Sequence, residues 1–584
     1  MKTKRLWSIL AIALLLASAA AAPAFAAQDN EPTREETFKV AIGGQIPDPT
    51  NLNFYAGASR SDTGLHQVVY EYLFYNNLQT GEFIPWLAES YEYNDDYSAL
   101  TVHLRDGVTW SDGEAFTSDD IVFTYELLKA NPAMEWAAEA NDAVASVEAT
   151  DPLTAVFNLA TPSPRFHLNR EAFPAVQIWG GLTILPQHIW GNEADPLAFK
   201  NSDPIGTGPY VLDSASQNGL TYRLNPDYWG TTVFGHAPGP KEIQFQYLGD
   251  EQTVALALAS NELDVATIGI LSAGTFEQIA GQNPNITAWT ADLPYAWADP
   301  CPRALMIQNA NPPLDNPDVR WAISSLIDRE AIVALAYEGT TIPAQGIWPS
   351  YDAVQPYMDS VSDLYAEYPV DYDPDRAAEL FEQAGIDPSD LTLRYTVNSD
   401  SVEDVKVSQV VSDQLAAAGI DVQVEQMTAQ AREPLLLTGD YDISFQAFCP
   451  GYITENLELF HSKFFVPLGE NAPWYERNSF RYQNPEFDAI IDQMLALPPD
   501  AEDQLIPLFQ EAMAIWLPDL PVIPLVQAPA LVPFNSTYWQ GWPTADDPWN
   551  MPVSWWATFN LVVNGYANAE TGDWVGGLQP AASS

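Results

Sequence analysis

The sequence predicts an α/β protein made of several structural units, and three observations support this class. Between residues 391 and 448, strand-like runs (391–397, 420–426 and 442–448) alternate with amphipathic helix-like stretches (402–418 and 430–437). A second strand–helix–strand pattern covers residues 243–268 and predicts parallel pairing with a right-handed crossover. The length of 584 residues corresponds to ~4 units of ordinary size.

The N-terminus carries the features of an export signal. Basic residues precede an apolar run from Leu6 to Ala22, and Ala24-Phe25-Ala26 offers a cleavage site, which predicts a signal peptide over residues 1–26. No cysteine lies near this site, so we expect no lipid anchor. No later apolar run approaches the ~20 residues of a membrane span. We therefore expect an extracytoplasmic protein, in the periplasm or at the cell surface, that begins with a flexible leader over residues 27–37.

The charge balance restricts the partners. The chain has 78 acidic and 23 basic residues, a formal net charge of −55. This field repels polyanions, so nucleic acid is a poor partner, and a neutral or cationic ligand is easier to bind than an anion. The plainer interpretation, that the charge only maintains solubility, stays open.

Residues 104–129 combine a strand end, two turns and a helix. Residues 101–105 alternate like a half-buried strand, and Asp106-Gly107 supplies a tight turn. A second turn at Ser111-Asp112-Gly113 follows Trp110, and Thr117 stands where it can cap the next helix.

This run closely resembles the signature of the extracytoplasmic solute-binding proteins of ABC importers, family five, which bind oligopeptides, nickel or oligosaccharides. Further segments agree in the same order: IGTGPY (205–210), NPDYW (225–229), DVRWAI (318–323) continuing to IDRE (327–330), and DPDRAA (373–378). The resemblance covers nearly the whole chain after the signal. In that family the run at residues 104–129 is scaffold in a lobe that touches the ligand little, which implies a structural role for Trp110 and Asp112. It implies an α/β, two-lobed periplasmic-binding-protein-like fold (type II, cluster C) with an extra inserted lobe.

The same resemblance, with the predicted elements, implies a division into three lobes. Lobe I is discontinuous, and its three segments are residues 38–62, 205–298 and 527–584. Lobe II is inserted and spans residues 63–204, and lobe III spans residues 299–526. The chain crosses between lobes I and III twice, near residues 295–309 and 521–526, and two crossings form a hinge.

A catalytic function is not indicated. The sequence has no H-E-x-x-H, P-loop, G-x-S-x-G or dinucleotide glycine motif, and its six histidines are scattered without metal-ligand spacing. We predict no enzyme activity, no metal site and no cofactor. The two cysteines, Cys301 and Cys449, either pair in the oxidising exterior or stay separate.

Candidate ligand-binding residues lie at strand ends and near the crossings. In the peptide-binding relatives, an aspartate in the loop after residues 441–448 pairs with the ammonium of the peptide. Gly451 stands at that position here, and Glu455 lies several residues further on. Aromatic rings instead match the C–H faces of a sugar. The predicted site is Asn53, Tyr55, Tyr295, Trp297, Phe448, Gly451, Tyr452, Trp539 and Trp542, with core packing as the alternative for each aromatic residue.

We therefore predict an extracytoplasmic substrate-binding protein of an ABC import system. It would close over a short oligomer, an oligosaccharide ahead of an oligopeptide, and deliver it as a monomer to the transmembrane subunits of a permease. The alternatives are a secreted glycan- or peptide-cleaving hydrolase and a structural envelope protein without a ligand.

Overall fold

The structure is a computed structural model that describes residues 31–57, 63–176, 178, 180–449, 452–474, 477–554 and 556–582. The predicted signal peptide lies outside these residues. Part of the expected flexible leader is bound to the rest of the protein: η1 (Arg34–Glu36) precedes the first strand, and both oxygens of the buried Asp264 carboxylate accept hydrogen bonds from Arg34 at 2.8 and 2.9 Å. No helix among the described residues is long and apolar enough to cross a membrane.

Lobe I is built on a seven-stranded sheet in the order β13-β19-β12-β1-β11-β10-β9. Its strands are β1 (Thr37–Ala41), β9 (Tyr210–Ser216), β10 (Gly219–Leu224), β11 (Glu242–Gln246), β12 (Val265–Ala266), β13 (Ile286–Thr287) and β19 (Phe534–Asn535). Its helices are η2 (Phe54–Ala56), α4 (Trp229–Val233), α5 (Glu251–Ala259), α6 (Ala273–Gln282) and α17 (Phe559–Asn564). The small pairs β20 (Trp539–Gln540) with β23 (Gln579–Pro580), and β21 (Tyr566–Ala567) with β22 (Trp574–Val575), belong to the C-terminal tail.

The strand–helix–strand unit at residues 243–268 forms as predicted, except for its pairing. Strands β11 and β12 are parallel, but each pairs with β1, which lies between them. The N-terminal strand β1 therefore lies at the centre of the sheet. Both of its edges are free when the later strands form, so β11 pairs with one edge and β12 with the other.

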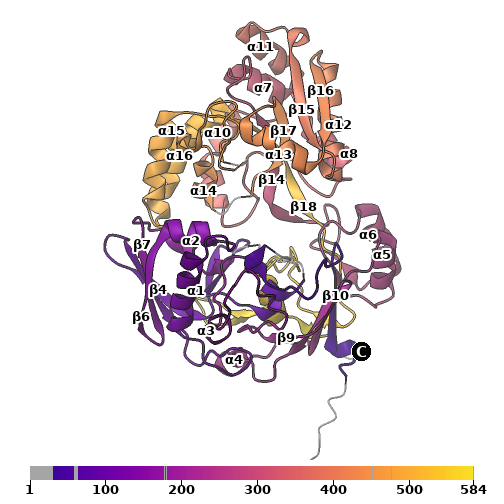
Figure 1. The fold of residues 1–584 in the computed structure, drawn as a ribbon. Coiled ribbons are helices and arrows are strands. Elements are labelled where there is room, and N and C mark those ends of the chain that lie inside the picture. The colour runs from indigo at the N-terminus through magenta and orange to yellow at the C-terminus, as the bar shows by residue number, and fades with distance from the viewer. Residues whose placement is uncertain are drawn as a thin grey trace, which may run out of the picture.

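Lobe II is inserted between β1 and β9 and occupies the lower left of Figure 1. One sheet has the order β4-β5-β7-β6, from β4 (Ala88–Tyr93), β5 (Ala99–Leu104), β6 (Val144–Asp151) and β7 (Thr154–Leu159). The other has the order β3-β2-β8, from β2 (Phe74–Asn77), β3 (Glu82–Pro85) and β8 (Ala175–Val176). The helices are η3 (Leu65–Val69), α1 (Ser118–Ala130), α2 (Ala137–Ala143), η4 (Phe166–Leu168) and α3 (Gln187–Trp190).

The signature run lies in this lobe, with most of its apolar side chains buried and its two turns exposed. Trp110 is buried, its indole N–H points to the Asp120 carboxylate at 3.4 Å, and Asp112 pairs with His188 at 2.7 Å. The helix predicted after Thr117 is α1, and Asp120 accepts a hydrogen bond from the Thr117 amide. The glycines of IGTGPY pack against backbone: a Cβ at Gly206 would lie 2.0 Å from the carbonyl oxygen of Val69.

Lobe III is built on a five-stranded sheet in the order β16-β15-β17-β14-β18 and forms the upper half of Figure 1. Its strands are β14 (Trp297–Ile307), β15 (Thr392–Asn398), β16 (Asp421–Met427), β17 (Ile443–Ala447) and β18 (Val522–Ala530). Its helices are α7 (Pro317–Ser325), α8 (Arg329–Ala336), α9 (Gln355–Ser360), α10 (Ser362–Glu367), α11 (Pro374–Ala384), η5 (Pro388–Asp390), α12 (Val402–Ala417), α13 (Ala429–Thr438), α14 (Ile453–Glu458), η6 (Ser462–Phe464), α15 (Pro485–Leu495) and α16 (Glu502–Asp519).

Local capping explains several of these helix boundaries. The side chain of Asn316 accepts a hydrogen bond from the Asp318 amide, and Pro317 occupies the first position of α7. Asp373 and Pro374 start α11 in the same way, and Gly385 ends it in the left-handed conformation, with φ 70°.

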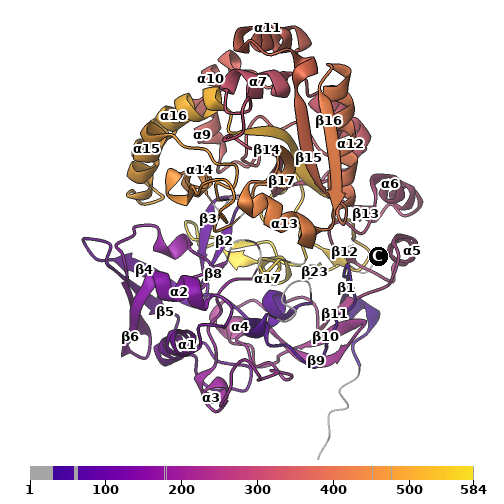
Figure 2. The ribbon, with the colours of Figure 1, turned by 45° about the horizontal axis from the view of Figure 1, so that its top comes forward.

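The two crossings lie side by side. Strands β14 and β18 pair antiparallel from Trp297 opposite Ala530 to Met306 opposite Val522, and both join the lower half to the upper half (Figures 1 and 2). One hydrophobic core runs through lobes I and II and also includes Tyr351 of lobe III, a smaller one lies around α5 and α6 in lobe I, and most of lobe III packs around a core of its own. This division predicts two rigid bodies, lobes I and II against lobe III, that rotate about the paired crossings.

Candidate functional site

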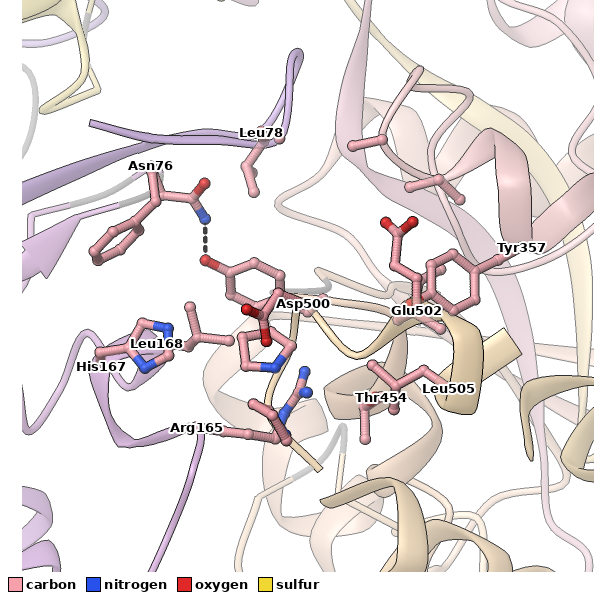
Figure 3. Close-up of a pocket in the computed structure, with 18 of the residues that line it drawn as sticks. Asn76, Leu78, Arg165, His167, Leu168, Tyr357, Thr454, Asp500, Glu502 and Leu505 are labelled. Carbon is pink, nitrogen blue, oxygen red and sulfur yellow. Dashed lines mark hydrogen bonds between the residues drawn. The ribbon is translucent and has the colours of Figure 1, made fainter. Parts of the chain in front are cut away.

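A cavity of about 680 Å³ lies between lobe II and lobe III. Lobe II contributes residues of β2, β4 and the segment around η4, and lobe III contributes residues of α9, α14 and the start of α16. In Figure 3, Asn76 and His167 lie on one side, and Tyr357 and Glu502 on the other. The volume lies in the range of sites that enclose a small molecule.

The lobe II wall is aromatic. Phe83, Tyr91 and Tyr93 line it together with His167. The His167 ring stacks on Tyr91 with centroids 4.7 Å apart, and its Nδ1 lies 2.9 Å from the Tyr93 hydroxyl. Strand β4 produces this arrangement because residues 91 and 93 point to the same face.

The lobe III wall is also aromatic, and its residues are Trp348, Tyr351, Tyr357 and Tyr452. Trp348 is 4% exposed, and its indole N–H has no hydrogen-bond partner within the described part of the chain. A buried donor without a partner costs free energy. It is therefore a candidate to bind a ligand acceptor.

The charges of the lining are mostly negative. Arg165 is the one arginine or lysine among the described lining residues, and burial lowers the pKa of His167 to about 3, so this ring is neutral at pH 7. Asp500, Glu502 and Glu570 also line the cavity. Within the described residues, these three carboxylates form no ion pair and no side-chain hydrogen bond. The cavity thus suits hydroxyl groups or a cation, and it disfavours an anion.

Three polar contacts join lobes II and III at the cavity. The guanidinium of Arg165 binds the carboxylate of Glu455 through two hydrogen bonds, of 2.7 and 3.1 Å, and also donates to the carbonyl oxygen of Leu497 at 3.3 Å. The amide of Asn76 donates a hydrogen bond to the hydroxyl of Tyr452, drawn as a dashed line in Figure 3. Glu455 is therefore engaged by Arg165 and does not stand free to bind a ligand ammonium.

Among the residues predicted from sequence, Tyr452 lines the cavity. Gly451 lies outside the described residues. Trp297 is 1% exposed and lies behind the wall: its ring stacks on Tyr351, and its indole N–H donates to Gln79 at 2.8 Å.

The other predicted residues pack elsewhere. Asn53, which caps η2, and Tyr55, which bonds to Thr183, are fully buried at the junction of lobes I and II. Trp539 and Trp542 pack around Phe38. As positioned here, these side chains face the core and not the cavity, which favours the packing alternative.

Two further predicted aromatic residues also have partners outside the cavity. Phe448 stacks on Phe460 within the core of lobe III. Tyr295 is half-buried against Phe276, and its hydroxyl donates to Glu277 at 3.0 Å.

Sequence reasoning missed most of the wall. Tyr351 and Trp348 belong to a proline-containing loop before α9, whereas Phe83 belongs to β3, and Tyr91 and Tyr93 to β4, in the two sheets of the inserted lobe. The predicted residues lie at strand ends and near the crossings, because α/β proteins commonly bind ligands there. A usable signal existed in the aromatic and proline-rich loop at residues 347–357.

Cys301 and Cys449 form a disulfide that joins β14 to the loop after β17. The sequence left this pairing open. Because the bridge fixes the start of the segment that carries Tyr452, it supports the lobe III wall. The described residues contain no cluster of side chains suited to hold a metal ion.

Comparison with known sequences places the chain in a family. The profile of the bacterial extracellular solute-binding proteins, family 5 Middle, matches residues 82–460. The protein belongs to this family.

Curated relatives agree. The glutathione-binding protein GsiB of Escherichia coli is 28% identical over 447 residues, which cover 75% of this chain and 80% of GsiB. Protein XP55 of Streptomyces lividans is 29% identical over 372 residues, which cover 61% of this chain and 62% of XP55. The match to XP55 thus spans less than two thirds of that relative.

Solved structures show the same two-lobed fold. The periplasmic oligopeptide-binding protein of an oligopeptide ABC transporter from Thermotoga maritima superposes with a TM-score of 0.79 at 22% identity, covering 94% of this chain and all of that one. A structure of that Thermotoga protein with bound mannohexaose gives a TM-score of 0.70 at 24% identity, covering 95% of this chain and all of that one.

Proposed function

We propose that this family 5 protein is the extracytoplasmic substrate-binding component of an ABC import system. It holds a short oligomer in the cavity between lobes II and III and delivers it, as a monomer, to the transmembrane subunits of a permease. The ligand leaves unchanged, because the protein acts by binding and not by cleavage.

The observation that carries this proposal is the cavity between lobes II and III. Its two walls come from different lobes, and both walls supply aromatic rings. Closure therefore places a ligand between rings of lobe II and rings of lobe III. Rotation about β14 and β18 changes the distance between the walls, which is how a binding protein couples ligand to closure.

We favour a neutral oligosaccharide as the ligand. Tyrosine and tryptophan rings stack on the C–H faces of sugars, and carboxylates such as Asp500 and Glu502 accept hydrogen bonds from hydroxyl groups. The Thermotoga protein, which shares the fold, has been crystallised with mannohexaose.

A short peptide is the second candidate, and the same carboxylates favour it. Asp500, Glu502 and Glu570 bring negative charge that an ammonium group would neutralise. The relative GsiB is a glutathione-binding protein, and glutathione carries an amino group.

The test is a thermal-shift screen of the purified protein against cello-, manno- and xylo-oligosaccharides and di- to pentapeptides, followed by calorimetric titration of each hit. A ligand at 100 times its Kd stabilises the folded state by ~2.7 kcal/mol, which raises the Tm by a few degrees. Mass spectrometry of the ligand after long incubation checks that it stays intact. Cleavage would support a hydrolase, and no shift with either library would contradict the proposal.

The double variant Asp500→Asn/Glu502→Gln separates the two ligand classes. It removes two charges from the cavity, so binding of a peptide weakens by about tenfold, or ~1.4 kcal/mol, whereas a neutral sugar keeps most of its affinity. Glu379→Gln/Glu382→Gln, which changes two exposed carboxylates on α11 that do not line the cavity, is the matched control for net charge.

A further inference from the structure

A second cavity, of about 520 Å³, lies next to the first between the same two lobes. Three residues line both: Arg165 and Leu168 from lobe II, and Tyr452 from lobe III. These side chains form the wall that divides the space between the lobes into two compartments.

Contacts between the lobes connect the side chains of the wall. Tyr452 meets Asn76 through its hydroxyl, and Arg165 meets Glu455 through two hydrogen bonds. Because each contact has one partner on either side of the hinge, the wall forms only when the lobes are closed. In an open state, the two compartments are one continuous groove.

The chemistry of the compartments also differs across the wall. The first has the unpaired carboxylates Asp500, Glu502 and Glu570. The second is lined by Arg170 and Arg477, with Asp142, Glu171 and Glu458. A ligand that extends across the wall would have to bind the charged groups of both compartments.

We propose that the wall formed by Tyr452, Leu168 and the Arg165–Glu455 pair sets the upper length limit of the ligand. This inference rests on the proposed function. A ligand that fits the first compartment allows the lobes to close and the contacts of the wall to form. A longer ligand lies across the position of the wall, keeps Tyr452 from Asn76 and Arg165 from Glu455, and binds more weakly because closure loses these contacts.

The experiment measures Kd by calorimetry against oligomer length, from two to six units, for the sugar or peptide series that the protein binds. For the native protein we expect affinity to rise with length to a limit and then to fall. In Tyr452→Ala the wall is open, so the limit moves by at least one unit, and the ligand just above the native limit gains at least tenfold relative to the shortest one. Leu168→Ala, which lowers the same wall from lobe II, shifts the profile in the same direction.

Tyr452→Phe separates the two parts of this side chain, because it keeps the ring in the wall and removes the hydroxyl that binds Asn76. We expect its length limit to lie between those of the native protein and Tyr452→Ala. An equal loss of affinity at every length in Tyr452→Ala and no change of profile in Leu168→Ala would overturn the inference and leave Tyr452 as a simple contact residue. Absence of binding to every oligomer by the native protein would instead contradict the proposed function, and this inference with it.

Discussion

The indole ring of Trp297 stacks on the ring of Tyr351, with centroids 5.4 Å apart and planes inclined by 16°. Trp297 begins β14, one of the two crossings, whereas Tyr351 lines the cavity. The hydroxyl of Tyr351 donates to the carbonyl of Ala298 at 2.7 Å, so two contacts tie this wall residue to the crossing. The segment that acts as a hinge therefore also positions the wall that would bind the ligand.

Trp297→Ala should destabilise the protein and weaken ligand binding together. Removing a fully buried tryptophan costs ~3–5 kcal/mol of folding free energy, because the cavity left behind is not refilled. Loss of the stacked ring also frees Tyr351, which weakens binding. Denaturant unfolding measures the first effect and calorimetric titration the second.

Trp297→Phe is the control, since it keeps a ring against Tyr351 and loses only the hydrogen bond to Gln79. We expect it to retain most of the affinity. If Trp297→Ala lowered stability while affinity stayed native, the ring would serve packing alone and would not position Tyr351.

Much of the fold could be predicted because its signals are local. The elements of lobe III between residues 391 and 448 match β15, α12, β16, α13 and β17 to within about one residue, since periodicity, Ser401 and the glycines mark their ends. The place of β1 between β11 and β12 could not be predicted, because strand order depends on which edge is free when distant segments meet.

The site was harder to predict for a related reason. Trp539 and Tyr351 have the same aromatic character in the sequence and are both buried in one core, yet Tyr351 lines the cavity and Trp539 does not. The difference arises from the inserted lobe, whose position no local pattern encodes. Tyr452 was predictable because it follows a buried strand directly, where α/β proteins expose loops to ligands.

The Arg165–Glu455 pair should stabilise the closed arrangement of the lobes. Arg165 is 7% exposed and Glu455 27%, so the pair is largely shielded from solvent. Removing one partner with Arg165→Met leaves Glu455 without its cation and without both hydrogen bonds, which favours the open state. We expect a larger radius of gyration without ligand by small-angle X-ray scattering, and ligand binding weaker by about tenfold, or ~1.4 kcal/mol.

A double-mutant cycle with Glu455→Gln tests whether the two residues act as a pair, with an expected coupling of ~1–3 kcal/mol in ligand binding. The exposed pair Lys406–Glu338, which lies within lobe III, is the matched control and should show a coupling near zero. Equal couplings at the two pairs would mean that Arg165 and Glu455 do not control closure.

The disulfide between Cys301 and Cys449 should contribute to stability. It joins positions 148 residues apart, and a bridge across a long loop restricts the unfolded chain strongly. The variant Cys301→Ser/Cys449→Ser should lose ~2–5 kcal/mol of unfolding free energy. A thiol reagent applied to the unfolded protein without reductant should find no free thiol, and two after reduction. Two thiols before reduction would show that the bridge does not form.

Glu71 should make stability depend on pH. Its carboxylate is buried at the junction of lobes I and II, where it accepts hydrogen bonds from Trp86, Tyr228 and Trp229 at 2.6 to 3.1 Å. Burial raises the pKa of Glu71 from 4.5 to about 7, and this effect outweighs that of the hydrogen bonds, which lower the pKa. Between these two pH values the folded protein keeps a proton that the unfolded chain releases, so stability falls as pH rises.

The loss from Glu71 amounts to ~3 kcal/mol on going from below pH 4.5 to above pH 7, since each unit of pKa difference corresponds to ~1.4 kcal/mol. Glu71→Gln removes the titrating group. It lowers stability overall, because the amide presents a donor to the neighbouring donors, but it makes the unfolding free energy less dependent on pH by that amount.

Denaturant titrations of both proteins at pH 5, 6, 7 and 8 measure the difference. Burial also raises the pKa values of Asp264, Asp299 and Asp404 to about 6. These three groups contribute the same pH dependence of the unfolding free energy in both proteins, so their contribution cancels in the comparison. Parallel pH profiles for the native protein and the variant would show that Glu71 is ionised throughout this range, held by its three hydrogen-bond donors.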